Sequence, residues 1–383
     1  MKALHVITGL GVGGAEQQLR LLLRHLPVDC DVVTLTNPGS VAAGLAADGV
    51  RVHHLGMAGN RDLAALPRLV RLIRRGGYQL VHTHLYRACL YGRIAARLAG
   101  VRAVVATEHS LGDSQMEGRP LNAGVRALYL AGERLGRTTV AVSPTVAERL
   151  RRWGVPGPRI EVVPNGIDVA RFRYDPARRA ETRRRLGLPE DAYVVGAVGR
   201  LAPGKRFGTL IRALAHLPAD HRLLLVGAGP EEDVLRRTAR AAGVADRVLF
   251  TGERPYVPDG SPGPDLPSLT SAMDVLASPS AEEAFGLAVV EGLAAGLPVL
   301  YASCPALQDL PPSAAPTARQ VTGGPDAYAR ALMDVHRQGP GPRTVPEAAH
   351  HYCITRSAAR LMDVYAAAVS RPLSAPSQEA RTS

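Results

Sequence analysis

The chain has few of the residues that mark several classes of protein. Its 383 residues include four cysteines, Cys30, Cys89, Cys304 and Cys353, which lie far apart and form no C-x-x-C pair. We therefore expect reduced thiols in the cytoplasm instead of a disulfide framework or a zinc ribbon. No window approaches the roughly 18 uninterrupted apolar residues of a transmembrane helix, and the N-terminal segment lacks the apolar core and cleavage site of a signal peptide.

The chain is also poor in aromatic residues, with 1 Trp, 11 Tyr and 4 Phe. Because base-stacking platforms need aromatic rings, we expect no nucleic-acid partner, and a basic nucleic-acid-binding protein stays as the non-enzymatic alternative. The formal net charge of +12 instead favours phosphorylated small molecules or anionic lipid headgroups. The arginine-rich stretch 68–75 predicts either peripheral contact with the inner face of an anionic membrane or a solvated amphipathic helix.

The hydrophobic pattern predicts an α/β protein in which short apolar strands alternate with longer helical segments. Continuous apolar strands separated by helices are typical of doubly wound parallel sheets covered on both faces. Because 383 residues exceed what one hydrophobic core usually supports, we expect two such domains. The strands are expected at 3–8, 30–36, 79–84, 103–107 and 138–143 in the first domain, and at 193–199, 222–227, 247–251, 275–278 and 298–301 in the second.

The domain boundary is expected in a polar stretch near residues 170–188. We assign 1–172 to the first Rossmann-like domain and 188–350 to the second. Residues 354–370 have helical spacing and predict a closing helix, and residues 372–383 have the composition of a disordered tail. The Pro/Gly-rich stretch 255–267 predicts an exposed loop.

Two turns after expected strands have the features of phosphate sites. The first strand runs into Gly9–Gly14 and then a helix, where backbone N–H groups can approach an anion, although a purely structural turn stays open. No Gly-Lys-Ser/Thr follows, and the second strand ends without an acidic residue, so neither a P-loop nor NAD is expected. In the second domain, Arg200 and Lys205 share a loop past the carboxyl end of a strand, where open α/β sheets bind ligands.

The most informative segment is 278–299. There a strand ends, a turn carries Glu283, and a helix containing Glu291 follows. Free N–H groups at the start of that helix can hold a phosphate. Glu283 is placed to accept hydrogen bonds from sugar hydroxyls, and Glu291, about two turns further on, from ribose hydroxyls. A capping role for Glu283 stays the structural alternative.

The pair Glu283 and Glu291, with seven residues between them, resembles the signature of retaining glycosyltransferases of glycosyltransferase family 4. The resemblance spans about residues 1–300 and resumes in the final helix. It implies a GT-B fold, in which two Rossmann-like domains face a cleft and the C-terminal helix, about 355–371, crosses back to the N-terminal, acceptor-side domain. The segments that carry it are 13–16, 143–144, 163–168, 199–201 with Lys205, 285–287 and 294–299.

The resemblance also implies roles on the donor side. Arg200 and Lys205 would neutralise the diphosphate. Glu291 would bind the ribose and Glu283 the transferred sugar, while main-chain atoms around Arg254 would read the base edge. The donor-binding set so implied is Gly13, Gly14, Arg200, Lys205, Arg254, Glu283, Ala284, Phe285, Gly286, Leu287 and Glu291; the catalytic set is His109, Glu283, Arg200 and Lys205.

On the other side of the cleft, the family pattern places first-domain residues. Gly13 and Gly14 would cap the phosphates when the domains close. His109 follows a strand and matches the family's histidine near the sugar and the acceptor. With His84 and Asn165, it makes up the implied acceptor side.

We expect no metal and no cofactor. His82 and His84 on one strand could suggest zinc, but no third ligand is evident in the sequence. The triplet 29–31, Asp-Cys-Asp, resembles the metal-binding motif of the other major glycosyltransferase fold, but its place before an apolar strand predicts a surface turn.

The expected function is that of a metal-independent, retaining hexosyltransferase. The donor would be a nucleotide-diphosphate sugar, with a UDP-sugar favoured and GDP-mannose as the other choice. The acceptor would be a hydroxyl of a glycan, a lipid-linked sugar or a small molecule, in exopolysaccharide, cell-envelope glycan, glycolipid or glycosylated-metabolite biosynthesis. A nucleotide-sugar epimerase or a phosphorylase is the alternative, although no lysine is convincingly placed for pyridoxal phosphate. Residues 302–309 depart from the family pattern and leave the sugar pocket undefined.

Overall fold

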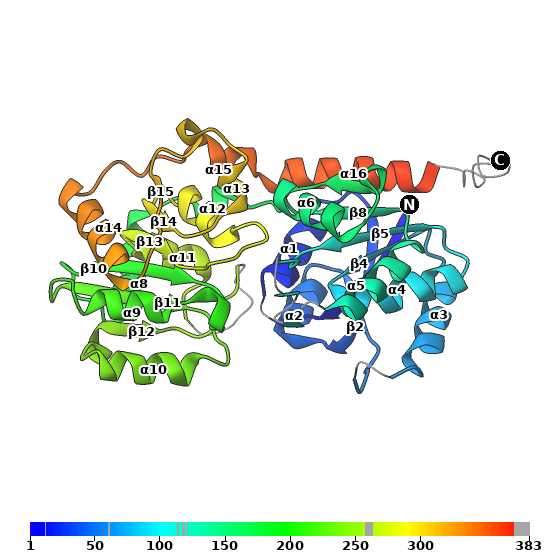
Figure 1. Cartoon of the computed structure of the whole chain (residues 1–383), viewed down its shortest axis with the longest axis horizontal. Helices are drawn as coiled ribbons and strands as arrows, with labels where there is room; N and C mark the ends of the chain where they lie inside the picture. The colour runs from blue at the N-terminus through cyan, green and yellow to red at the C-terminus, as the bar shows by residue number, and fades with distance from the viewer. Residues whose placement is uncertain are drawn as a thin grey trace.

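The computed structural model describes residues 1–11, 13–59, 62–112, 115–116, 119–120, 122–256 and 263–370. The expected tail 372–383 and the middle of the expected loop 255–267 lie outside the described residues. The chain forms two domains, each built on a parallel sheet with helices on its faces (Figure 1).

The first sheet has the strand order β3-β2-β1-β4-β5-β8-β9, and all its pairs are parallel. Its central strands are buried on both faces because helices cover both. The strands are β1 (Lys2–Gly9), β2 (Asp29–Asn37), β3 (Arg51–His54), β4 (Leu80–His84), β5 (Ala103–Glu108), β8 (Thr138–Ala141) and β9 (Ile160–Val162). The helices are α1 (Gly14–Leu23), α2 (Gly39–Ala47), α3 (Ala65–Gly76), α4 (Tyr86–Leu98), α5 (Ala123–Glu133), α6 (Pro144–Trp153) and α7 (Val169–Phe172).

The second sheet has the order β12-β11-β10-β13-β14-β15 and is also parallel. Its strands are β10 (Tyr193–Val198), β11 (His221–Val226), β12 (Val248–Phe250), β13 (Val275–Ser278), β14 (Val299–Tyr301) and β15 (Ala318–Gln320). The helices of this domain are α8 (Pro176–Arg185), α9 (Gly208–Leu214), α10 (Glu232–Ala241), α11 (Leu266–Ala272), α12 (Leu287–Ala294), α13 (Pro305–Gln308), α14 (Pro325–Gln338) and α15 (Glu347–His351), and the chain ends in α16 (Ile354–Ser370). A short antiparallel pair, β6 (Gln115–Met116) and β7 (Arg119–Pro120), belongs to the first domain.

The last helix, α16, returns to the first domain, as Figure 1 shows in red. Its apolar face joins the core of the first sheet, where Leu361 and Tyr365 are buried. Where the chain crosses between domains, Ile167 and Cys353 form a parallel bridge, so the outgoing and returning segments lie side by side. The strands of the first sheet lie between residues 2 and 162, and those of the second between residues 193 and 320.

Several local expectations were wrong. The edge strands β3, β9 and β15 are short and half exposed, and the apolar pattern did not reveal them. Residues 29–31 begin β2 instead of a surface turn, because Asp31 is buried and accepts a hydrogen bond from Tyr78 at 2.6 Å. The end of the expected loop 255–267 starts α11, with Asp265 as its N-cap and Pro267 in its first turn.

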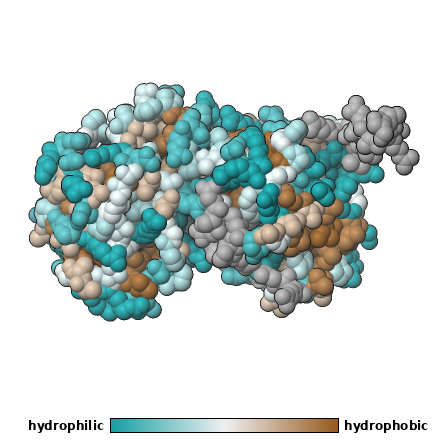
Figure 2. Space-filling model, viewed as in Figure 1, coloured by the Kyte–Doolittle hydropathy of each residue, from teal (hydrophilic) through white to brown (hydrophobic). Residues whose placement is uncertain are grey.

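The arginine-rich stretch forms α3, whose apolar face, with Leu69 and Ile73, lies in the core. Arg68 donates to the carbonyl of Leu55 and Arg74 to that of Leu98. Figure 2 shows a mostly hydrophilic face, with a hydrophobic patch over α4 and α5. Within the described residues, no helix has the length and apolar character needed to cross a membrane.

Candidate functional site

The strand order of each sheet reverses at one place, and both places lie toward the domain boundary. In the first sheet the reversal is between β1 and β4, and in the second it is between β10 and β13. Loops that leave the carboxyl ends of such strand pairs form the usual ligand site of open α/β sheets. The two sites approach each other closely, since a Cβ on Gly14 would lie 3.3 Å from Leu287. The N-termini of α1 and α12 therefore meet across the boundary.

The second-domain loop after β10 carries the two predicted cations. Lys205 Nζ lies 2.5 Å from Glu283 Oε1, so the predicted phosphate and sugar ligands are paired with each other. Arg200 is exposed and close enough to Glu253 to oppose the rise in the pKa of Glu253 that burial causes. Lys205 is one of only two lysines in a chain otherwise rich in arginine.

Glycine allows a second loop to pack directly on this one. Gly227 and Gly229, after β11, have positive φ angles, and a Cβ on either would lie within 2.4 Å of a backbone oxygen of residues 199–201. The backbone N–H of Leu201 donates to the carbonyl of Ala228. The loop with Arg200 and Lys205 is thus held by backbone contacts with the loop after β11.

The turn from Glu283 to α12 is shaped by Gly286. Gly286 has φ = 100° and caps α12, and a Cβ there would lie 2.5 Å from Cys304 Sγ. Cys304 belongs to the stretch 302–309, which departs from the family pattern. In this chain the stretch lies directly behind the turn 283–287, called the donor turn below after its predicted ligand, and the N–H of Ala306 donates to the carbonyl of Phe285. The stretch 302–309 therefore supports the backbone of the turn at Phe285 and Gly286.

Glu291 lies on α12 as expected, and its carboxylate already has a partner within the protein. Its side chain is buried, and burial raises its pKa to about 7. Its carboxylate accepts a hydrogen bond from the hydroxyl of Tyr256, which opposes that rise. Tyr256 packs edge to face on Phe172 of α7, and its carbonyl accepts from Arg171. The carboxylate predicted to bind the ribose is therefore hydrogen-bonded to a tyrosine of the proline-rich loop.

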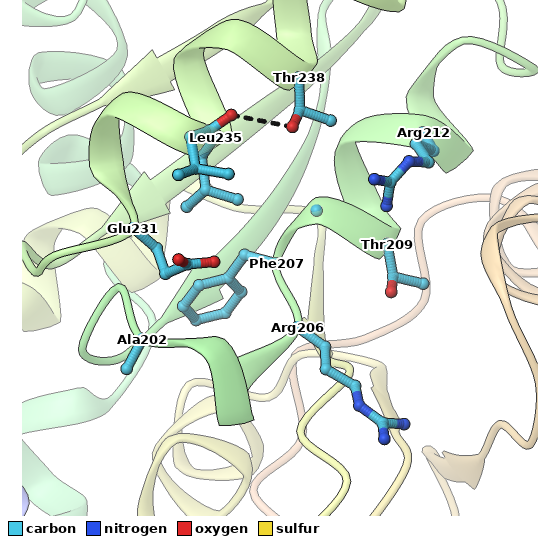
Figure 3. Close-up of a pocket in the computed structure, with 10 residues that line it drawn as sticks. Ala202, Arg206, Phe207, Thr209, Arg212, Glu231, Leu235 and Thr238 are labelled. Atoms are coloured by element: carbon cyan, nitrogen blue, oxygen red, sulfur yellow. Dashed lines mark hydrogen bonds between the residues drawn. The ribbon is translucent and has the colours of Figure 1, made fainter. Parts of the chain in front are cut away.

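The turn predicted to read the base is anchored to the sheet. The N–H of Gly227 donates to the carbonyl of Gly252, which ties the turn to the end of β11. Arg254 is half-buried and lies against Gly263. A separate hollow between α9 and α10 is lined by Phe207, Arg212, Glu231 and Thr238 among others (Figure 3). No predicted donor residue lines that hollow, so it is distinct from the site.

The first domain holds the donor turn through α6, which the sequence did not assign to the site. The hydroxyl of Ser143 accepts from the N–H of Val146, capping α6, and donates to the carbonyl of Ala284 at 2.7 Å. Arg149, one turn further on, donates to the carbonyl of Glu283 and pairs with Glu282 at 3.4 Å. Residues 143–144 carry part of the family resemblance but were given no role in the site, and the sequence pattern did not single out Arg149.

The histidines predicted for the acceptor side are connected. His84 Nδ1 lies 3.1 Å from His109 Nε2, and burial lowers the pKa of His109 to about 4. His5 on β1 lies beside them, with its Nδ1 3.0 Å from His84 Nε2. The sequence suggested no third partner for His82 and His84, because His5 lies more than 70 residues away; the fold supplies it.

Asn165 is half-buried in the segment between β9 and α7. The next residue, Gly166, exchanges two hydrogen bonds with the side chain of Gln18 on α1. Asn165 therefore lies beside α1, the helix that begins at Gly14. Within the described part of the chain, Asn165 makes no hydrogen bond with these histidines.

Comparison with known proteins agrees with this arrangement. A family model described as Glycosyltransferase Family 4 matches residues 12–171, and a model described as Glycosyl transferases group 1 matches residues 178–339. The chain belongs to glycosyltransferase family 4. Gly13 and Gly14 of the first-domain glycine turn lie within the matched regions of this family 4 member, as does the second-domain donor turn.

A D-inositol 3-phosphate glycosyltransferase of Salinispora tropica is 32% identical over 329 residues, which are 77% of this chain and 65% of the relative. A 2-deoxystreptamine glucosyltransferase of Streptomyces kanamyceticus is 33% identical over 248 residues, or 62% of each chain. The chain thus spans slightly less than two thirds of these curated relatives. The structure of HepE from Anabaena in complex with UDP and glucose matches with a TM-score of 0.83 at 22% identity, covering 96% of this chain and 100% of that chain. This likeness confirms the GT-B fold of the family 4 member.

Proposed function

We propose that this protein transfers a sugar from a nucleotide-diphosphate sugar to a hydroxyl group of an acceptor. The observation that carries the proposal is the contact between Lys205 and Glu283, in front of the N-terminus of α12 and beside the glycine turn of the first domain. A cation, a carboxylate and free helix N–H groups in one place match the diphosphate and the hydroxyls of such a donor.

The same contact suggests how the donor enters. In the free protein, Lys205 and Glu283 neutralise each other. A diphosphate carries more negative charge than one carboxylate, so it would draw Lys205 away and release Glu283 to accept hydrogen bonds from the sugar. Arg200, exposed on the same loop, and the N–H groups at Gly14 and Leu287 would complete the phosphate contacts.

We further propose that transfer retains the configuration of the anomeric carbon. The bond from C1 to the phosphate oxygen breaks, the acceptor oxygen bonds C1 on the same face, and its proton passes to the departing phosphate. Neither carboxylate is placed as a free nucleophile, because Glu283 pairs with Lys205 and Glu291 is buried against Tyr256. Fixed cations and N–H groups would stabilise the leaving diphosphate, which is usually the largest catalytic contribution. The anomeric coupling constant of the product in NMR tests retention.

UDP is the favoured nucleotide, because the HepE structures contain UDP or UDP-glucose. GDP is the competing choice, since a relative in Mycobacterium tuberculosis, 35% identical over 218 residues, is named as GDP-mannose-dependent. Small hydroxylated acceptors gain support from the names of relatives that contain D-inositol 3-phosphate and 2-deoxystreptamine. A thermal-shift panel of UDP-, GDP-, ADP- and dTDP-sugars decides the base, since a ligand at one hundred times its Kd stabilises by about 2.7 kcal/mol.

The proposal is tested by transfer assays on the wild-type protein and on Lys205→Ala. Loss of one charge-assisted contact of about 1.5–3 kcal/mol predicts a rise of roughly ten- to a hundredfold in donor KM or a matching fall in kcat/KM. Lys2→Ala is the matched control, as it removes the other lysine, which pairs with Asp31 away from the site. Protection of Lys205, but not Lys2, from acetylation by the nucleotide would add direct evidence. Release of an epimerised sugar without an acceptor would instead indicate an epimerase.

Metal independence is part of the proposal, because Arg200, Lys205 and two helix N-termini supply positive charge for the diphosphate. Transfer rates should be unchanged in EDTA. We also propose a cytoplasmic location with peripheral attachment to anionic membrane, supported by the outward arginines of α3, Arg71 and Arg75. Failure to sediment with phosphatidylserine vesicles at low salt would refute the membrane contact, and it would leave the transfer activity intact.

A further inference from the structure

Four histidines and a tyrosine form one hydrogen-bonded chain inside the first domain. His82 Nδ1 lies 2.6 Å from the hydroxyl of Tyr365, which lies 3.4 Å from His5 Nε2. The chain continues from His5 Nδ1 to His84 Nε2 at 3.0 Å, and from His84 Nδ1 to His109 Nε2 at 3.1 Å. It thus joins the C-terminal helix α16 to the residue predicted to face the sugar and the acceptor.

One end of this hydrogen-bonded chain has a further partner, and the other end has none among the described residues. At the inner end, His82 Nε2 lies 2.6 Å from Thr107 Oγ1. At the outer end, His109 Nδ1 is shielded from solvent and has no hydrogen-bond partner among the described residues. A buried polar atom without a partner is costly, so this nitrogen is suited to a hydrogen bond with a ligand.

The imidazoles of the chain are neutral at physiological pH. Burial lowers the pKa of His5 to about 3 and that of His109 to about 4, and it lowers those of His82 and His84 well below the ordinary value. A neutral imidazole carries one N–H, so it donates through one nitrogen and accepts through the other. Every link of the chain must then point in the same direction, toward His109 or away from it.

This constraint couples Tyr365 to the open nitrogen. If Tyr365 donates to His5, then His5 donates to His84, His84 donates to His109, and His109 Nδ1 carries a proton and is a donor. If the direction reverses, His109 Nδ1 is an acceptor. The tautomer of His109 is thus coupled, through three successive hydrogen bonds, to the direction in which the Tyr365 hydroxyl on α16 donates.

Metal binding by His5, His82 and His84 is the competing use of these residues, since their ligand atoms lie within 4.8 Å of one another. The contacts favour the hydrogen-bonded chain. Both nitrogens of His82 are taken by hydroxyls at 2.6 Å, and both nitrogens of His84 are taken by other imidazoles. A metal would have to break these bonds.

We propose that Tyr365 and His5 are positioning residues that set the tautomer of His109 through this chain, and so decide whether His109 Nδ1 donates to or accepts from the bound sugar or acceptor. The inference rests on the proposed function for its role in transfer. The coupling itself belongs to the protein alone and can be measured without substrate.

The test is ¹⁵N NMR of the full chain labelled at histidine, which distinguishes the two neutral tautomers by their ring-nitrogen shifts. His109→Gln and His84→Gln identify the signals. We expect a single neutral tautomer of His109 in the wild-type protein and a changed pattern in Tyr365→Phe. In the transfer assay, Tyr365→Phe should lower kcat by about tenfold at nearly constant donor KM, because that is about the loss expected when one hydrogen bond from His109 to the reacting groups is misdirected.

Tyr78→Phe is the matched control, because it removes a buried hydroxyl of the same domain that is bonded to Asp31 and lies outside the chain. It should change neither readout. If Tyr365→Phe folds poorly, His5→Gln breaks the chain at its next link and should give the same two changes. An unchanged His109 pattern in both variants overturns the coupling, and a changed pattern with unchanged kcat overturns the positioning role. Stoichiometric zinc that stays bound through dialysis also overturns the hydrogen-bonded chain. Absence of transfer by the wild-type protein instead refutes the proposed function.

Discussion

Replacing Glu291 with glutamine should stabilise the protein at high pH while weakening donor binding. Glu291 is buried, and its pKa of about 7 compares with an ordinary value of 4.5. Because the folded carboxyl holds its proton more tightly than the unfolded one, the stability it contributes is complete below about pH 4.5 and is lost as pH rises through about 7. Glutamine is neutral at every pH and still accepts from Tyr256.

The magnitude follows from the two pKa values. Their difference, at 1.36 kcal/mol for each pH unit, amounts to about 3 kcal/mol at pH 8.5. For a domain of this size, about 3 kcal/mol corresponds to roughly 6–12 °C in Tm. The advantage of Glu291→Gln over the wild-type protein should therefore grow by this amount between pH 5 and pH 8.5. Loss of a charged acceptor for the ribose should meanwhile raise the nucleotide Kd by about tenfold or more.

Scanning calorimetry is the suitable assay, because the only tryptophan, Trp153, lies in the first domain and its fluorescence would not follow the second. Glu161→Gln, at an exposed carboxyl of β9, is the control and should melt in parallel with the wild-type protein at every pH. If the Tm of Glu291→Gln instead follows that of the wild-type protein at every pH, ionising the buried carboxyl does not cost the predicted free energy. Isothermal titration with UDP gives the Kd of each variant.

Three further substitutions test the donor turn. Arg149→Met should raise the donor KM by about tenfold, because the turn loses the contacts of Arg149 with Glu282 and Glu283. An unchanged KM in steady-state assays would show that the turn keeps its shape without this arginine. Gly286→Ala should destabilise the folded protein by about 1–3 kcal/mol in calorimetry, because the residue has a positive φ and the new methyl group would clash with Cys304. Adding Cys304→Ala should recover part of that loss by removing the clash. If nothing is recovered, the loss comes from backbone strain alone. Tyr256→Phe should tighten UDP binding severalfold at pH 8.5 by freeing Glu291, and weaker binding in titration would instead place the hydroxyl in the ribose site.

Residues close together in the chain could be assigned from the pattern alone. Glu283 and Glu291 belong to one strand, turn and helix, so their spacing sets their relative positions. Most strands were predicted to within one or two residues, because their apolar runs are continuous and each is bounded by glycine or polar residues. The short edge strands β3, β9 and β15 were not predicted, because their half-exposed residues form no such apolar runs.

Contacts between distant parts of the chain could not be read in this way. The hydroxyl of Tyr256 on Glu291, Arg149 on the donor turn, and Tyr365 on His82 join residues that are 35, 134 and 283 positions apart. Nothing in the local composition of either partner specifies the other.

The sequence by itself determined the two parallel sheets, the loop with Arg200 and Lys205, and the spacing of Glu283 and Glu291, since each depends on periodicity or on spacing within a few turns of chain. The tertiary structure alone decided that Lys205 is paired with Glu283, that Glu291 is covered, and that His109 ends a chain of imidazoles that begins at α16. These features depend on which side chains lose water together when the domains and the last helix pack. That burial sets their partners and their pKa values.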